Sequence, residues 1–381
     1  MMARFLELHA LQSIPVANLN RDDLGSPKMV TYGGADRIRV SSQALKRPIR
    51  HGVEADLGEY SFRTRQLPNR HQAILTDAGW TPEAAAFAWK QITATVGKGE
   101  KNLKFEISKQ TGLPITLVLL LLPDTALREL ADLCDAHRLA LESEQAKKKP
   151  AQILPAGDVH AILKSRNISI SMFGRMLAEL PGANVDGAVQ IAHAFTTHAA
   201  EPQRDYFTAV DDWLSDNEDV AGTGHLDTAE FSAGVFYRYG CLNLDDFLKN
   251  LGGDRETAAR AAASFADHFL MSLPQAKKNS TAPHTLPDLA YLTVRDRRPI
   301  SFAAAFETPA RPMRGGGIAE PSRDAFNAYA ADVARLTAGR GLLFGGHASV
   351  GDRTFEHLNE RFDSYEALID AAVLALVAQQ P

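Results

Sequence analysis

The chain has 381 residues, of which 45% are hydrophobic and 23% are charged. These are ordinary values for a globular protein, so a sizeable core is expected, and disordered, collagen-like and low-complexity classes are excluded. The net charge of −5 would argue against a nucleic-acid partner if the charges were evenly spread, but binding depends on their local distribution.

Cysteine and apolar content indicate the compartment. Cys134 and Cys241 lie far apart and outside any CxxC pattern, which excludes a disulfide framework and a four-cysteine zinc site and is typical of a reducing environment. The longest apolar run, Ile115–Leu122, is far short of the roughly 20 residues that span a bilayer. The N-terminus has no apolar signal segment. We therefore expect a cytoplasmic protein without a membrane partner.

The first predicted elements are two strands and a helix. Arg4–Ile14 has the apolar pattern of a strand with one buried face. Arg37–Val40 alternates basic and β-branched residues and predicts a second strand. Ser41 and Ser42 then offer an N-cap for a helix.

Residues 66–165 are rich in alanine, leucine and mixed charges, which predicts a helical insertion. Helices are predicted within it over residues 82–94, 125–148 and 157–164. After the insertion, Asn167–Met172 predicts a strand and Val185–Thr197 predicts a helix.

The segment Glu201–Val220 holds seven acidic residues against one base, and it predicts a protruding loop. Glu230–Tyr239 predicts a strand, and Asp254–Leu270 and Ser322–Thr337 predict helices. The elements together predict a discontinuous body of helices and strands that is interrupted by the helical insertion and the loop.

The strongest local signal is a cluster of positive charge. Residues 37–53 contain five Lys or Arg side chains and no acid. On a helix, four polar side chains of this segment would share one face: Gln43, Lys46, Arg47 and Arg50. Next to the backbone N–H groups of a helix N-terminus, this face favours a phosphate site, and the alternative is a solvated basic face. Pro48 complicates the helix, because an interior proline costs about 3 kcal/mol.

An aromatic pattern follows on the strand predicted near residue 235. Val235, Tyr237 and Tyr239 would share one face of that strand and could stack nucleic-acid bases. The alternative is that they pack in the core.

Catalytic and metal-binding motifs are missing from the sequence. It has no P-loop, HExxH or GxSxG pattern. His193 and His198 are five residues apart, so they would not share a helix face as metal ligands do, and the glycine-rich stretch 339–351 lacks a Lys-Ser/Thr pair for phosphates. We expect no enzymatic activity, no cofactor and no metal.

Five segments carry a resemblance to a known family. They are LNRDD (19–23), RIRVSSQALKR (37–47), VDGAVQIAHAFTTH (185–198), DYFTAVDD (205–212) and EFSAGVFYRY (230–239). In this order they resemble the CasC-type backbone subunit (Cas7 family) of the type I-E CRISPR-associated Cascade complex. The insertion and the last hundred residues match only loosely.

The resemblance implies an α+β fold shaped like a right hand. Its palm would have a modified RRM-like (ferredoxin-like) fold of the RAMP superfamily and comprise residues 1–65, 166–198 and, with a web, 231–381. The finger would be the helical insertion 66–165, and the thumb would be a loop over residues 199–230.

The resemblance also implies a function. Copies of a non-catalytic subunit would stack along the CRISPR RNA (crRNA) without reading its sequence, kink it at regular intervals, and present it for pairing with target DNA. The implied partners are crRNA, target DNA through the crRNA, further copies of the chain, and the large, small, 5′-handle and repeat-processing subunits of Cascade.

The site residues implied by the resemblance fall into three groups. Contacts to the RNA backbone would come from Arg21, Lys28, Ser41, Gln43, Lys46, Arg47 and Arg50. The kink would be formed by Met176 and Phe207, with core packing as their alternative, and Arg175 and Thr208 beside them would also bind RNA. DNA would be attracted by Lys147, Lys148 and Lys149, for which a solvated charge run is the alternative.

Two other functions remain open from the sequence. A repeat-cleaving endoribonuclease of the same superfamily would need a positioned histidine, and the candidates are His9, His51, His193 and His198. A small-molecule enzyme with a helical lid would need a deep pocket with perturbed titratable groups.

Overall fold

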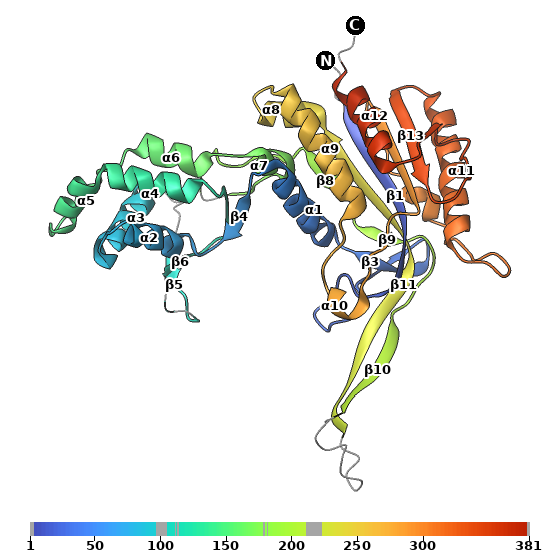
Figure 1. Cartoon of the computed structure of the whole chain (residues 1–381), viewed down its shortest axis with the longest axis horizontal. Helices are drawn as coiled ribbons and strands as arrows, with labels where there is room; N and C mark the ends of the chain where they lie inside the picture. The colour runs from blue at the N-terminus through green and yellow to red at the C-terminus, as the bar shows by residue number, and fades with distance from the viewer. Residues whose placement is uncertain are drawn as a thin grey trace. The chain divides into compact units, whose positions relative to one another are not determined.

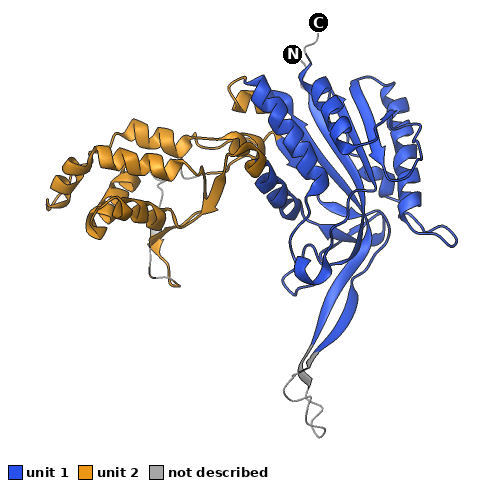
Figure 2. Cartoon of the chain, viewed as in Figure 1, with its two compact units in different colours: residues 1–53, 189–245, 254–381 blue, residues 54–188, 246–253 orange. Residues whose placement is uncertain are grey.

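The structure is a computed structural model that describes residues 4–96, 105–110, 112, 114–177, 180, 182–210 and 223–378 (Figure 1). The chain divides into two compact units (Figure 2). Unit 1 comprises residues 1–53, 189–245 and 254–381, and unit 2 comprises residues 54–188 and 246–253. The insertion predicted over residues 66–165 therefore lies within unit 2.

Unit 1 is built on one large, mostly antiparallel sheet. Its strands follow the order β14 (Glu360–Arg361), β13 (Leu342–Ser349), β12 (Leu289–Arg295), β1 (Phe5–Ala17), β11 (Thr223–Asn243), β9 (Ala194–Thr196), β3 (Ala35–Val40) and β2 (Met29–Tyr32). Two further strands pair with β11: β8 (Val189–Ile191) and β10 (Gln203–Val210). Among the described residues of this sheet, only the short contact of β13 with β14 is parallel. The mixture of helices and strands confirms the predicted α+β class.

The helices of unit 1 lie on both faces of this sheet. They are α1 (Ser42–Leu57), α9 (Arg255–Met271), α10 (Lys278–Thr281), α11 (Ala319–Thr337), α12 (Tyr365–Val377) and the 3-10 turn η1 (Ala303–Phe306). The last turn of α1, from Glu54, and most of α8 (Leu244–Asn250) belong to unit 2. The helices α9 and α12 pack together, and α11 packs with η1. The strand predicted at the N-terminus is confirmed, but both of its faces are buried rather than one, because it lies in the middle of the sheet.

The aromatic strand face belongs to the core. Tyr237 is buried in a cluster with Phe302 and Phe306 of the η1 region and Phe326 of α11. The base-stacking interpretation of this face is therefore wrong, and core packing is confirmed.

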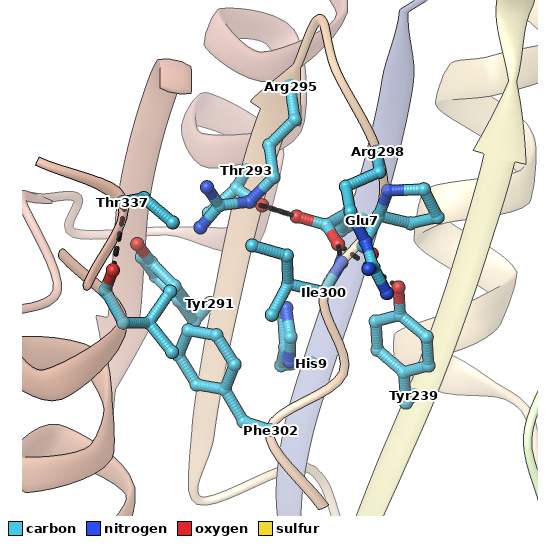
Figure 3. Close-up of polar contacts among 12 residues, drawn as sticks. Glu7, His9, Tyr239, Tyr291, Thr293, Arg295, Arg298, Ile300, Phe302 and Thr337 are labelled. Atoms are coloured by element: carbon cyan, nitrogen blue, oxygen red, sulfur yellow. Dashed lines mark hydrogen bonds and ion pairs between the residues drawn. The ribbon is translucent and has the colours of Figure 1, made fainter. Parts of the chain in front are cut away.

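A buried carboxylate ties three strands of unit 1 together (Figure 3). Glu7 of β1 accepts hydrogen bonds from Arg295 Nε at 2.6 Å and Thr293 Oγ1 at 2.7 Å, both on β12. It also accepts from the Tyr239 hydroxyl of β11 at 3.0 Å and from the backbone N–H of Ile300. Burial raises the pKa of Glu7, while Arg295 acts in the opposite direction. Removing one partner of such a pair typically costs about 3–5 kcal/mol.

Unit 2 is mainly helical. Its helices are α2 (Leu67–Asp77), α3 (Pro82–Val96), α4 (Ala126–Ala136), α5 (Arg138–Gln145), α6 (Ala156–Lys164) and α7 (Ile168–Phe173). Two small sheets accompany them, β4 (Ser61–Thr64) with β7 (Leu120–Pro123) and β5 (Phe105–Ile107) with β6 (Pro114–Thr116). The helices predicted over 82–94 and 157–164 are confirmed, and the one predicted over 125–148 is divided at His137.

Two predictions near the end of the insertion are wrong. Residues 167–172 form helix α7 instead of a strand, because the Asn167 side chain caps it by accepting a hydrogen bond from the Ile170 backbone at 3.0 Å. Residues 185–197 contain strands β8 and β9 instead of a helix, because they pair with β11. In both segments the spacing of the apolar residues fits a helix as well as a strand, so the sequence pattern did not distinguish the two.

The acidic segment is a hairpin rather than a loop where the structure describes it. Strand β10 pairs with the first part of β11 from Gln203↔Phe231 to Val210↔Thr223, and Figure 1 shows this hairpin as the yellow-green arm of unit 1. Residues 211–222 of the predicted thumb loop lie outside the described residues. No helix among the described residues is long and apolar enough to cross a membrane.

Unit 2 has a buried histidine that predicts a pH dependence of stability. Burial lowers the pKa of His71 from 6.5 to about 4, since its ring packs on Trp89 and its Nε2 lies 3.8 Å from Cys134 Sγ. Because the fold favours the neutral ring, the contribution of His71 to the free energy of unfolding is complete above pH 6.5 and is lost as the pH falls toward 4. At pH 5 the loss is about 2 kcal/mol of unfolding free energy.

The measurement is urea unfolding at pH 7 and pH 5, followed by tryptophan fluorescence, since Trp80 and Trp89 both lie in unit 2. His71→Leu should unfold with a smaller difference between the two pH values than the wild type. An unchanged difference would show that His71 is not the titrating group.

Candidate nucleic-acid interface

The basic segment forms helix α1 directly after strand β3. The Ser41 backbone N–H donates to Asn20 Oδ1 at 2.9 Å, and the Ser41 carbonyl accepts from Ala44 at 3.0 Å and Leu45 at 3.2 Å. The first amide of this turn is therefore already bonded, and Ser41 itself is buried. The helix continues through Pro48 to Leu57, so the proline does not end it.

The apolar residues of α1 fix which face is exposed. Leu45, Ile49 and Val53 are buried, as the four-residue spacing predicts. The exposed residues Gln43, Arg47 and His51 lie at the same spacing on the other side. Lys46 and Arg50 are half-buried beside this row.

A groove of about 880 Å³ runs along α1, and we call it the α1 groove. Arg47, Pro48 and His51 line it from the helix, and residues 271–276 and 284–286 line the other side. No lining residue is acidic. His51 was a candidate only for a nuclease site, although its position one turn after Arg47 places it on this face.

Arg21 lies in a loop that is anchored to the hairpin. Asp22 Oδ1 accepts from the backbone N–H groups of Leu24 and Ser26, each at 2.9 Å. Asn18 Nδ2 donates to the Glu230 carbonyl of β11 at 2.8 Å. Arg21 and Phe207 therefore line one pocket of about 420 Å³, which we call the hairpin pocket.

The hairpin pocket combines both signs of charge. Arg204 and Lys277 line it together with Asp227 and Glu230. Arg204 Nε lies 3.2 Å from Glu230 Oε1, and hydrogen bonds from Ser26 and Arg204 lower the pKa of Glu230. Arg21 and Lys277 are exposed and take part in no ion pair among the described residues, so both are cations that this pocket can offer to an anion.

The hairpin presents aromatic side chains to solvent. Phe207, opposite Asp227, is 42% exposed, and its neighbour Tyr206 is 65% exposed. Successive residues of a strand point to opposite faces, so the two rings lie on different faces of the hairpin. Thr208 is exposed on the same face as Tyr206. Phe207 is not a core residue, and Tyr206 was missed because the resemblance did not single it out.

Arg175 and Met176 lie in unit 2 and have opposite environments. Arg175 is 4% exposed, and its guanidinium donates to the carbonyls of Ala183 at 2.8 Å, Ser165 at 2.8 Å and Lys164 at 2.9 Å. The prediction that this side chain contacts RNA is therefore wrong. Arg175 instead stabilises the backbone of its own chain through these hydrogen bonds. Met176 is 87% exposed, so core packing does not explain it.

The three consecutive lysines of unit 2 lie in an exposed turn after α5. Lys147 Nζ lies 2.5 Å from Glu144 Oε1, and Lys148 and Lys149 precede Pro150. They lie between helices instead of on one face of a helix.

The four candidate histidines are not brought together. His9 is buried among aromatic rings, and its Nδ1 lies 3.0 Å from the Tyr237 hydroxyl. His198 is buried, and its Nε2 accepts from the Val235 backbone N–H at 3.2 Å. His51 and His193 are exposed, the latter 2.9 Å from Arg39. Among the described residues, no group of three or more His, Cys, Asp and Glu side chains is arranged to hold a metal.

The contrast between Arg175 and Met176 can be tested by measuring the free energy of unfolding of alanine variants. Arg175→Ala removes a buried cation and leaves several buried carbonyls without a donor, so the unfolding free energy should fall by about 3 kcal/mol or more. Met176→Ala, the matched control, should change it by less than about 0.5 kcal/mol, because the side chain is exposed. Equal losses in urea unfolding would contradict these roles.

Solved structures include chains that are similar to this one over nearly its whole length. One solved chain, from a "CRISPR RNA-guided surveillance complex, pre-nicking", is 46% identical with a TM-score of 0.91 and covers 98% of this chain and 100% of its own. A second, from a "CRISPR RNA-guided surveillance complex", is 42% identical with a TM-score of 0.81 and covers 97% and 99%. No curated protein sequence matches the chain.

The family model described as "CT1975-like protein" matches residues 6–371. Since this match spans nearly the whole sequence, the chain belongs to the CT1975-like protein family.

Proposed function

We propose that the chain is a crRNA-binding backbone subunit of a CRISPR surveillance complex, of the CasC type (Cas7 family) in a type I-E Cascade. Unit 1 would be its RRM-like palm with the thumb hairpin, and unit 2 would contain its finger. The observation that carries the proposal is the acid-free α1 groove, in a chain that is similar over its full length to chains of two such complexes.

The α1 groove suits the backbone of RNA. Arg47 and His51 line it, Gln43 extends the same exposed row, and Lys46 and Arg50 lie beside them. Side chains of this kind contact phosphates and sugars and carry no sequence information. A subunit that must accept any spacer needs contacts of this type.

The kink would be formed by exposed apolar side chains. Met176 on unit 2 and Phe207 on the hairpin are large hydrophobic residues held on ordered backbone, and both are open to solvent. Apolar side chains of this kind can wedge between stacked bases. The acidic hairpin would reach the basic surface of a neighbouring copy, since its carboxylates repel phosphate.

The further partners follow from the same proposal. Target DNA would pair with the bound crRNA, and Lys148 and Lys149, which are adjacent exposed cations of unit 2, would attract it. The large, small, 5′-handle and repeat-processing subunits would complete the assembly.

We propose no nuclease activity. Two of the four candidate histidines are buried and already hydrogen-bonded. The other two are exposed but lie apart, since His51 lines the α1 groove and His193 lines a different groove of unit 1. Metal-free cleavage of purified repeat RNA that is lost with His51→Ala would favour the endoribonuclease instead.

The basic helix predicts a change in salt dependence. Lys46→Ala combined with Arg50→Ala should weaken binding of every single-stranded RNA alike. Each lost phosphate contact reduces the slope of log affinity against log salt by about 0.7, so the double variant should be flatter by about 1.4. The measurement is fluorescence anisotropy at several salt concentrations.

A matched control removes the same charge elsewhere. Lys148→Ala combined with Lys149→Ala should leave RNA affinity and its salt slope close to those of the wild type. If both double variants change affinity equally, the effect comes from net charge and not from α1.

The hairpin predicts an effect on RNA conformation. Phe207→Ala should remove the regularly spaced, nuclease-sensitive nucleotides along bound RNA while leaving overall affinity within a few-fold. Tyr206→Ala is the control on the opposite face and should keep the pattern. An identical pattern in both variants would exclude Phe207 from the kink.

The proposed function as a whole is tested by purification with a CRISPR array and neighbouring genes. Bound RNA of one defined length, uncut and protected at regular intervals, supports a repeating backbone subunit. An RNA-free monomer would overturn the proposal, and RNA trimmed at one site would point to the endoribonuclease.

A further inference from the structure

A second groove of about 400 Å³ lies at the β2 edge of the unit 1 sheet, and we call it the edge groove. It is lined by Val30, Thr31 and Tyr32 of β2, Arg39 of β3, His193 and Phe195 of the β9 segment, and Ala303 of η1. Its lining is mainly apolar, and no carboxylate takes part in it. None of these residues was assigned a role above.

Two aromatic rings form a rigid corner in the edge groove. The centroids of Tyr32 and Phe195 lie 5.3 Å apart with an interplanar angle of 72°. The Arg37 guanidinium lies 5.9 Å from the Tyr32 centroid, and Phe195 packs on Tyr237 at 6.1 Å. Buried neighbours thus hold both rings, so a planar ligand would find a preformed stacking surface.

Cations flank this corner. Arg39 lies 2.9 Å from His193 Nδ1, and an arginine can only donate, so this nitrogen accepts and the ring proton sits on Nε2. Burial, Arg39 and Lys28 lower the pKa of His193, which keeps the ring neutral. The groove therefore offers an N–H donor and the permanent charge of Arg39, and Lys28 adds a second positive charge near His193. Two carboxylates lie beside the lining residues without lining the groove themselves: Asp36 accepts from Thr31 Oγ1 at 2.9 Å, and burial together with Glu307 raises the pKa of Tyr32.

The edge groove is connected to the predicted RNA contacts through the backbone. The Lys28 carbonyl accepts from the Arg39 N–H at 2.7 Å, and the Lys28 N–H donates to Asn20, whose side chain holds the start of α1. The groove lies on the sheet face opposite α1, since Val40 packs with Leu45 while Arg39 points to the other side. A strand of RNA that passes over the β2 edge would contact α1, Lys28 and the groove in turn.

We propose that the edge groove binds one unpaired nucleobase of single-stranded RNA, stacked on one ring of the Tyr32–Phe195 corner and edge-on to the other, with its phosphate near Arg39 and Lys28. The proposal rests on the RNA-binding function above and adds a base-holding site to its backbone contacts. Aromatic stacking tolerates any base, so the site keeps binding independent of sequence.

The test uses the full-length chain and a uridine-rich RNA that carries 5-iodouridine. Irradiation should attach the RNA to Tyr32, Phe195 or His193, as identified by mass spectrometry, in addition to adducts near α1. Tyr32→Leu keeps an apolar side chain but removes the stacking surface, so it should lose the groove adduct and weaken RNA binding roughly tenfold. Tyr32→Phe is the matched control and should retain both.

The outcomes separate this proposal from the function on which it rests. RNA binding with α1 adducts but no groove adduct overturns the base site and leaves the function intact. A Tyr32→Leu protein that binds RNA normally but no longer self-associates would assign the groove to a second copy of the chain, which also overturns it. A wild-type protein that binds no RNA at all would overturn both.

Discussion

The pairing of β1 with β11 is the constraint on which unit 1 depends. The two strands run antiparallel from Phe5↔Asn243 to Ile14↔Gly234, with a bulge before Ala17↔Ser232. Since side chains alternate along a strand, a shift of one residue would exchange the two faces. Glu7 would leave Arg295, and Tyr237 would leave the cluster under α11. The hydrogen bond from the Tyr239 hydroxyl of β11 to Glu7 therefore helps to specify the register that the hydrophobic pattern alone leaves ambiguous.

The same strand also positions the hairpin. β11 spans 21 residues without interruption, pairing with β1 through its second part and with β10 through its first. Phe207 and the hairpin pocket thus have positions set by the core of the sheet. Farther along the sheet, beyond β9, strand β3 leads directly into α1. Because Leu45 and Ile49 of this helix are buried, Arg47 faces outward. Side chains that would meet RNA are placed by neighbours that never touch it.

Much of this arrangement is readable from the sequence, and the exceptions have physical causes. The α1 face follows from four-residue spacing, and the N-terminal strand from its apolar pattern. Residues 185–197 could not be assigned correctly, because their partner residues on β11 lie about 40 to 50 positions later in the chain and decide their structure. The burial of Arg175 was equally hidden, since its acceptors are backbone carbonyls, which carry no sequence signal. The edge groove needs β2, β3 and β9 side by side, a contact that no single segment reveals.

The order of the strands also bears on how the chain is made. β1 has its partners in β11 and β12, more than 200 residues later in the sequence, whereas nearly all of unit 2 is the continuous segment 54–188. During synthesis, unit 2 can fold as soon as it has left the ribosome, because its contacts are local. The apolar β1 strand must wait with both of its edges unpaired until β11 emerges. Nascent chains of this protein therefore pass through a period in which β1 is open to wrong strand pairing, and chaperone demand should be greatest in that interval.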